Sequence, residues 1–213
     1  DGIHLDYVRY PEDTSYGYNP VALDRFRRIY KREDTPGARD ADFNEFRRRQ
    51  VTDLVRQVYL RATAVRPQIR VSAAVITWGN GPANDAGYRS LDAYSRVYQD
   101  WRGWMEEGIV DLAMPMSYFR EQQNAAFLNR WMDYYKDRQY SRGLLVGLGN
   151  YLNTIPDTLA QVSRALAPSS GGGNKPLGCA LYSYASTNVL NAMGLPTVSN
   201  DEFYRALGET LGE

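Results

Sequence analysis

The residue best suited to chemistry is Asp6, a carboxylate inside an otherwise apolar segment between Leu5 and Tyr7. An ionised carboxylate is costly to bury unless it is paired. Asp6 therefore either bonds to a structural partner such as Arg9 or a strand-end hydroxyl, or serves as a nucleophile or general acid/base with a pKa shifted by burial. Perturbed carboxylates mark functional sites only statistically, so both interpretations stay open.

Two neighbours of Asp6 extend the candidate site. His4, the single histidine, shares the face of Asp6 because side chains alternate along a strand. Alone it cannot form a metal site, and the chain has no HxH or HExxH pattern. His4 is either a hydrogen-bonded core residue or a partner that orients Asp6 or a substrate. For Arg9, a salt bridge and a contact with substrate are equally supported interpretations.

Further candidates lie at or just after the ends of segments that read as strands. Their aromatic, hydroxyl and amide groups suit a neutral polyol, because polar groups bond its hydroxyls while rings pack on its faces. A strand-end tyrosine can also bond to a carbonyl or a developing charge. Core packing is the competing interpretation for each aromatic residue. These candidates are Tyr10, Trp78, Tyr118, Asn150 and Tyr182.

A repeated strand, loop and helix pattern must position these residues. We expect strands to start near residues 3, 70, 111, 144 and 178, with helices near 21–32, 42–66, 90–107, 122–138, 155–167 and 199–211. The apolar run at 70–78 suits a strand buried on both faces of a parallel sheet. The alternation fits either a (β/α)₈ barrel, whose site lies at the C-terminal ends of the strands, or an open doubly wound sheet. The open sheet would usually carry a Gly-rich phosphate loop after an early strand, and the chain lacks one.

Capping residues set several helix boundaries. Ser90 is expected to cap a helix that runs to Glu107 and stops at Gly108. Thr154 is expected to cap the helix near 155–167, and Ser199 with Glu202 forms a capping box for the last helix.

Composition excludes several classes of function. Lys plus Arg and Asp plus Glu number 25 each, so the net charge is zero. This balance argues against nucleic acid or an anionic membrane as a partner. Cys179 is the single cysteine, so no intrachain disulfide forms, and no apolar run is long enough to span a membrane. The chain has no P-loop, metal-ligand cluster or GxSxG elbow, so we expect no cofactor, no metal and no Ser-His-Asp triad.

The sequence resembles one known family. Its strand motif DGIHxDxxxYP, found in bacterial glycosyl-hydrolase-like 10 proteins, matches residues 1–11, which read DGIHLDYVRYP. The similarity continues through residues 70–78, 104–111, 114–118 and 147–151. Many members carry a second Asp after the one that matches Asp6, whereas this chain has Tyr7.

The resemblance implies a fold. The first motif is the fourth barrel strand in that family, so the chain would form a partial (β/α)₈ TIM barrel with parallel strands four to eight and outer helices. Residues 1–213 would then be the C-terminal five β/α units of a single barrel domain. The chain opens without Met inside a strand-like segment, so we expect an upstream segment, and either that segment or a second copy of the chain to complete the barrel.

The resemblance also implies a function. The protein would be a glycosidase, an O-glycosyl hydrolase that acts on a polysaccharide or oligosaccharide. It would be exported, periplasmic or part of the cell envelope. Some relatives act on peptidoglycan glycan strands stripped of their peptides. Asp6 would be the leading catalytic carboxylate.

Hydrolysis of a glycosidic bond generally needs a second carboxyl group. Glu121 is the first candidate, Glu12 and Asp13 are further ones, and the missing strands are another source. A non-catalytic carbohydrate-binding barrel is the alternative function, and an open-sheet interaction domain without an active site is a third. Similarity to family 18 chitinase-like enzymes is weaker. Their DxDxE strand keeps only Asp6 here, because His4 and Val8 replace the outer acids, so their substrate-assisted mechanism does not transfer.

Overall fold

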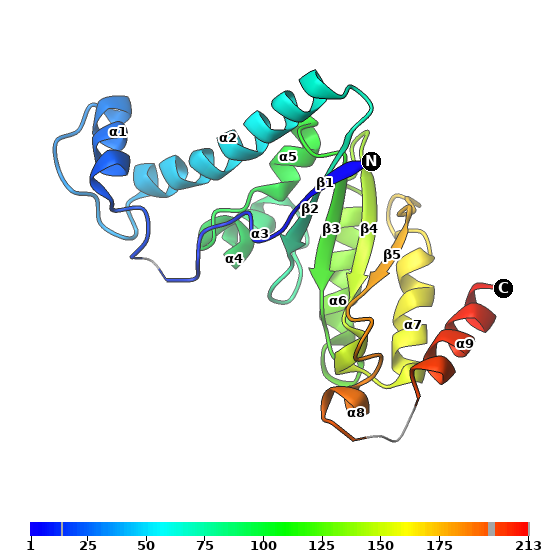
Figure 1. The fold of residues 1–213 in the computed structure, drawn as a ribbon. Helices are drawn as coiled ribbons and strands as arrows, with labels where there is room; N and C mark the ends of the chain where they lie inside the picture. Colours follow the sequence, from blue (N-terminus) through cyan, green and yellow to red (C-terminus); the bar gives the residue numbers. More distant parts are fainter. Residues whose placement is uncertain (14, 196–198, 213) are drawn as a thin grey trace.

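A single parallel sheet organises the protein, whose computed structural model describes residues 1–13, 15–195 and 199–212. Its strands run in chain order across the sheet, and every neighbouring pair is parallel (Figure 1). They are β1 (Gly2–Leu5), β2 (Arg70–Ile76), β3 (Leu112–Ser117), β4 (Gly143–Leu148) and β5 (Gly178–Leu181). This order is that of part of a (β/α)₈ barrel, and the doubly wound alternative is excluded because its strand order reverses within the sheet.

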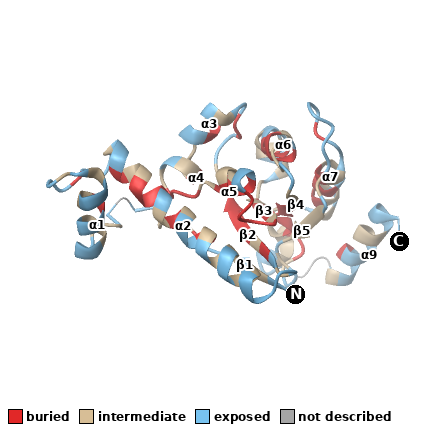
Figure 2. Cartoon of the chain, turned by 90° about the horizontal axis from the view of Figure 1, so that it is seen from above, coloured by how far each residue is buried: buried red, intermediate tan, exposed pale blue. Residues whose placement is uncertain are grey.

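Helices follow each strand in the described part of the chain. After β1 come α1 (Pro20–Tyr30) and the long α2 (Ala41–Val65), and after β2 come α3 (Asp85–Ser90), α4 (Asp92–Ser95) and α5 (Trp101–Glu107). α6 (Glu121–Lys136) follows β3, and the short 3₁₀ helix η1 (Asn150–Leu152) and α7 (Ile155–Leu166) follow β4. α8 (Val189–Ala192) and α9 (Asn200–Leu211) follow β5. Figure 2 shows the larger helices around the outside of the curved sheet, as the sequence predicted.

The helices cover one face of the sheet more completely than the other. Along β3 burial alternates, because Ala113, Pro115 and Ser117 are buried while the residues between them are half-buried. Such alternation indicates one face packed on helices and one that is more open. On the packed side the core contains three tryptophans that are almost fully buried: Trp101, Trp104 and Trp131. The more open, concave face would line the interior of a complete barrel, and a barrel places its site where the strands of this face reach their C-terminal ends.

The prediction of one helix near 90–107 is wrong, because α3 ends at Ser90 and two short helices, α4 and α5, follow it in this stretch. Ser90 ends α3 rather than capping a new helix, and Asn84 and Asp100 are the caps of α3 and α5. Between them the backbone is extended at Leu91 and left-handed at Tyr98, with φ of 55°. The break sends Gln99 into the core, where it bonds to the sheet.

The other predicted caps are confirmed. The hydroxyl of Thr154 accepts a hydrogen bond from the Asp157 N–H at 3.3 Å, and Ser199 accepts one from the Glu202 N–H at 3.2 Å. Gly108 ends α5 in the left-handed conformation with φ of 82°. Each of these caps depends on residues close together in the sequence, so the sequence alone predicts them.

Candidate active site

The chain turns sharply where β1 ends. Tyr7 has φ of 55°, a left-handed conformation that costs a non-glycine residue about 1–2 kcal/mol. The Arg9 N–H donates to the Tyr7 carbonyl at 2.8 Å, and the Tyr7 N–H donates to the Asp6 carboxylate at 2.7 Å. Backbone strain of this kind clusters at functional sites. The turn leaves Asp6 exposed at the C-terminal end of β1.

A buried amide supports this turn. Gln99 is fully buried, and its oxygen accepts a hydrogen bond from the Ile76 N–H at 2.8 Å. Its nitrogen donates to the carbonyls of Val8 and Ala74, each at 3.3 Å. β1 stops pairing with β2 at Leu5, so the Gln99 side chain takes the place of strand hydrogen bonds beyond that point. It thereby ties the segment after Asp6 to β2.

The sheet register places four of the predicted residues on one face. His4 lies opposite Ser72 in the register, and its Nδ1 is 2.9 Å from the Ser72 hydroxyl. Because side chains alternate along a strand, every second residue counted from His4, and from the residues paired with it across the sheet, points to the same concave face. Counted to the C-terminal ends of the strands, this series ends at Asp6, Trp78, Tyr118 and Tyr182.

Three tyrosines gather at the C-terminal ends of β3, β4 and β5. The rings of Tyr118 and Tyr182 are stacked, with centroids 5.4 Å apart and planes 17° apart. Tyr151 meets them edge-on, at 6.2 Å from Tyr118 and 5.8 Å from Tyr182. We call these residues the tyrosine cluster. It forms one aromatic surface from segments that are distant in sequence.

Asp6 lies close enough to this cluster to act on it electrostatically. Burial, as the largest cause, together with the neighbouring phenols of Tyr151 and Tyr182 and the charge of Asp6, raises the pKa of Tyr118 to about 12. Tyr118 therefore keeps its proton at neutral pH and can donate a hydrogen bond. Asp6, Tyr118 and Tyr182 are brought together, although they directly follow three different strands, β1, β3 and β5.

Asn150 positions the chain beside the tyrosine cluster. It is 1% exposed, and its amide nitrogen donates to the Ser183 carbonyl at 3.1 Å. This bond fixes the chain that follows β5 next to Tyr182. The side-chain oxygen of Asn150 is buried and has no hydrogen-bond partner among the described residues.

Arg9 stacks between two aromatic rings. Its guanidinium carbon is 4.0 Å from the centroid of the Tyr7 ring and 5.1 Å from that of Trp78. Within the described part of the chain it makes no ion pair, so the salt bridge to Asp6 considered from the sequence does not form in this structure. Arg96 lies over Trp78 as well, at 5.7 Å, but it pairs with Glu12.

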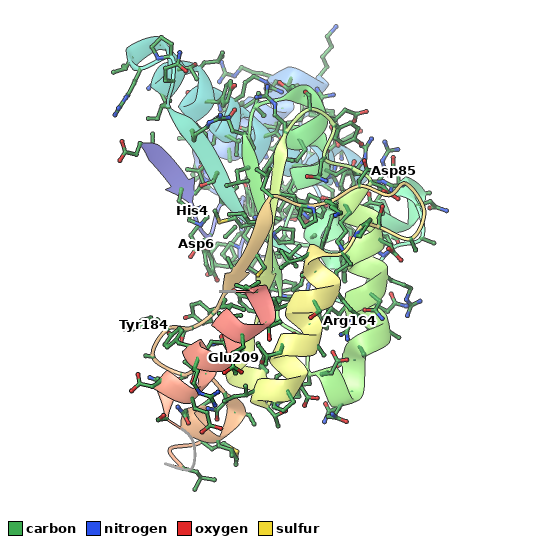
Figure 3. The ribbon with its side chains drawn as sticks, turned by 90° about the vertical axis from the view of Figure 1, so that its right-hand side faces the viewer. His4, Asp6, Asp85, Arg164, Tyr184 and Glu209 are labelled. Carbon is green, nitrogen blue, oxygen red and sulfur yellow. The ribbon has the colours of Figure 1, made fainter. Side chains whose placement is uncertain are left out.

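Glu121 points to the helices rather than to the concave face. Its carboxylate accepts hydrogen bonds from Arg164 at 2.5 Å and from Gln161 at 3.2 Å, both on α7. Figure 3 shows His4 and Asp6 on one side of the strands and Arg164 on the helical side. The structure therefore does not bring Glu121 together with Asp6.

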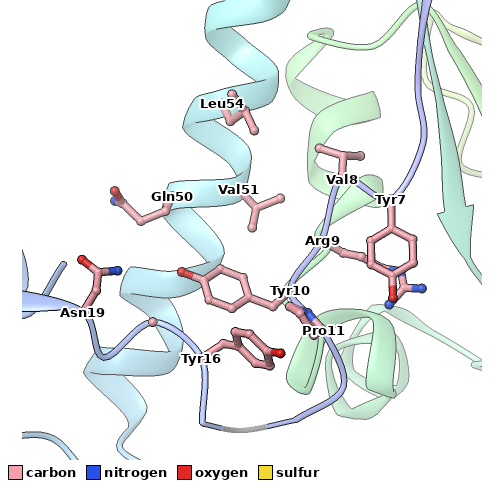
Figure 4. Close-up of a pocket in the computed structure, with 11 residues that line it drawn as sticks. Tyr7, Val8, Arg9, Tyr10, Pro11, Tyr16, Asn19, Gln50, Val51 and Leu54 are labelled. Atoms are coloured by element: carbon pink, nitrogen blue, oxygen red, sulfur yellow. The ribbon is translucent and has the colours of Figure 1, made fainter. Parts of the chain in front are cut away.

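Tyr10 also lies apart from the tyrosine cluster. Its ring packs edge-on against Tyr98 at 5.4 Å, and burial raises its pKa. It lines a pocket of about 390 Å³ between the segment after β1 and α2, whose walls include Val8, Gln50 and Val51 (Figure 4). Tyr7 and Arg9 also line this pocket, whereas Asp6, Trp78 and the tyrosine cluster do not, so the pocket adjoins the predicted cleft at Arg9 and does not contain Asp6.

Sequence comparison now identifies the family. Residues 1–162 match glycosyl hydrolase-like 10. The chain belongs to this family. A curated relative, glycosyl hydrolase YngK of Bacillus subtilis strain 168, is 25% identical over 156 residues, which cover 70% of this chain and 29% of that protein. The chain thus spans less than a third of that relative's length, and the resemblance carried by residues 1–11 is confirmed.

Sequence reasoning missed two features of the site. Gln99 gave no signal, because a polar residue in a polar stretch reads as surface, and Tyr151 was not among the predicted site residues. Among the described residues, no group of three or more His, Cys, Asp or Glu side chains could hold a metal ion. No described helix is both long and apolar enough to cross a membrane.

Proposed function

We propose that this chain carries the catalytic face of a glycoside hydrolase, with Asp6 as a catalytic carboxylate and the C-terminal ends of the strands on the concave side as the substrate cleft. The observation that carries the proposal is the proximity of Asp6 to the stacked rings of Tyr118 and Tyr182 at the C-terminal ends of the strands. In barrels of this type, catalytic groups come from that end of the strands.

The chemistry of the cleft suits a sugar polymer. The tyrosine cluster offers ring faces for the C–H surfaces of pyranosides and phenol groups for their hydroxyls. Trp78 adds a further aromatic surface near the end of β2. We propose a polysaccharide or oligosaccharide substrate, and glycan strands of the cell envelope, peptidoglycan included, as the substrate to test first. That substrate accords with an exported or envelope location.

Asp6 is suited to attack or to proton transfer because it is exposed and carries no ion pair within the described residues. Tyr118, protonated at neutral pH, can donate a hydrogen bond to this carboxylate or to the sugar oxygen beside it. Glu121 is engaged by Arg164, so we propose that the second carboxyl group comes from outside residues 1–213.

The open side of β1 is suited to further barrel units. Three apolar residues of α2 are exposed: Leu54 at 55%, Leu60 at 58% and Val65 at 88%. The pocket beside Tyr10 opens between the same helix and the end of β1. Exposed apolar surface next to an unpaired strand edge favours association. We propose that an upstream barrel segment of a longer protein packs here, in keeping with the greater length of the relative.

Asp6→Asn in the full-length protein tests the catalytic role. An amide neither attacks an anomeric carbon nor transfers a proton at neutral pH, so we expect glycan hydrolysis to fall by at least about 1,000-fold. Stability should change by less than about 0.5 kcal/mol, since Asp6 is exposed. The matched control is Asp24→Asn, which alters another exposed Asp, on α1, that pairs with Arg28.

The outcomes separate the two roles of Asp6. A fall in hydrolysis with a normal melting temperature and retained binding of N-acetylglucosamine oligomers supports catalysis. A destabilised Asp6→Asn protein that still hydrolyses glycan rejects it.

A non-catalytic carbohydrate-binding barrel is the second candidate. The engagement of Glu121 by Arg164 favours it, because the predicted second carboxyl group then does not lie beside Asp6. Binding of glycan oligomers by the full-length protein, with no release of reducing ends, would establish this alternative.

A further inference from the structure

Arg9 differs from other arginines that have buried donor atoms. Its Nε and Nη1 atoms are buried and have no hydrogen-bond partner among the described residues. Arg96, Arg102 and Arg142 also have an Nε without a hydrogen bond, but each of these side chains forms an ion pair with a carboxylate. Leaving buried donors of a charged group without an acceptor is costly. The described part of the chain therefore supplies Arg9 with rings but no counter-charge.

The two rings determine which part of Arg9 remains available. Tyr7 at 4.0 Å and Trp78 at 5.1 Å contact the guanidinium through their faces. A guanidinium donates its hydrogen bonds within its own plane, in a fork that matches the two oxygens of a carboxylate. Stacking and edge-on binding are thus compatible. Figure 4 shows the Arg9 side chain beside the Tyr7 ring and away from Asn19 and Gln50.

The neighbouring cation does not compete for the same ligand. Arg96 lies over the Trp78 ring at 5.7 Å, but Glu12 at 3.3 Å and Asp92 at 3.0 Å neutralise it. One unpaired guanidinium matches a single negative charge on two oxygens better than a phosphate, which carries more charge and more acceptors.

We infer that Arg9 binds the carboxylate of an acidic sugar in the cleft, next to the turn that carries Asp6. The inference rests on the proposed carbohydrate function and specifies the substrate class as a glycan with carboxylate-bearing units. Two sources share this chemistry: the lactyl ether of N-acetylmuramic acid and the ring carboxylate of a uronic acid. Trp78 then serves both as the ring that orients Arg9 and as a wall of the cleft.

Titration calorimetry on the full-length protein tests the inference with three oligosaccharides of equal length. They are a neutral N-acetylglucosamine oligomer, an oligomer that contains N-acetylmuramic acid, and an oligogalacturonate. We expect one acidic oligomer to bind about 10- to 100-fold more tightly than the neutral one, which is the effect of a hydrogen-bonded charge pair. Added salt should reduce that preference, because it screens the charge.

Variants assign the preference to Arg9. Arg9→Gln should bring the acidic oligomer to the affinity that the same variant has for the neutral one. Arg9→Lys, which keeps the charge and loses the fork, should retain part of the preference. Arg96→Gln is the matched control and should retain all of it. Melting temperatures of the variants confirm that each one is folded.

Each outcome decides between the hypotheses. Tighter acidic binding that Arg9→Gln removes supports the inference, and the oligomer that shows it identifies the source of the carboxylate. Equal affinity for neutral and acidic oligomers, or an acidic preference that survives Arg9→Gln, overturns the inference and leaves the proposed function standing. If none of the three oligomers binds, the carbohydrate function fails and the inference fails with it.

Discussion

Replacing Gln99 with Leu should lower the free energy of unfolding. The Gln99 amide bonds to β2 and to the segment after β1, where β1 itself no longer pairs with β2. The substitution keeps the side chain's approximate volume and removes its polar atoms. The buried Ile76 N–H then loses its acceptor at 2.8 Å, and the carbonyls of Val8 and Ala74 lose a donor at 3.3 Å each. An unsatisfied buried polar group costs about 1–3 kcal/mol. The two longer bonds contribute less, so we expect the free energy of unfolding to fall by about 2–5 kcal/mol.

Equilibrium unfolding in urea measures this change, with circular dichroism as the probe. Gln123→Leu on α6 is the matched control, because Gln123 is exposed, and it should alter stability by less than about 0.5 kcal/mol. Binding of N-acetylglucosamine oligomers should also weaken in Gln99→Leu, since Val8 anchors the turn that follows Asp6. A loss of stability no larger than that of the control would refute the role assigned to Gln99.

Three further predictions concern charged and titratable groups. Asp111→Asn should cost about 3 kcal/mol in urea unfolding, because the carboxylate is 8% exposed and pairs with Arg142 at 2.9 Å; a cost below 1 kcal/mol would contradict this. NMR titration of the Tyr118 ring should give a pKa near 12, which falls in Asp6→Asn as a negative charge is removed. Because this pKa is raised in the folded state, the associated stability is present below pH 10 and is lost as pH rises through 12. Glu121→Gln should lower the melting temperature with hydrolysis retained, and a loss of hydrolysis by orders of magnitude would restore its predicted catalytic role.

The sequence by itself determined the order of elements and the segment that carries the candidate site. Strand and helix alternate in the chain with distinct periodicities, and caps such as Thr154 and Ser199 act on residues three positions away. Alternation within β1 also placed His4 and Asp6 on one face. All of these depend on neighbours in the chain, so a single sequence reveals them.

Tertiary structure decided which distant groups meet. The register across the sheet stacked Tyr118 on Tyr182, and packing of α6 against α7 engaged Glu121 with Arg164 on the side away from the concave face. The break in the expected helix near 90–107 exists because Gln99 satisfies backbone groups of β2. Hydrogen bonds and ion pairs between segments far apart in the chain leave no periodic trace in the sequence, so only the folded chain shows where each polar side chain finds its partner.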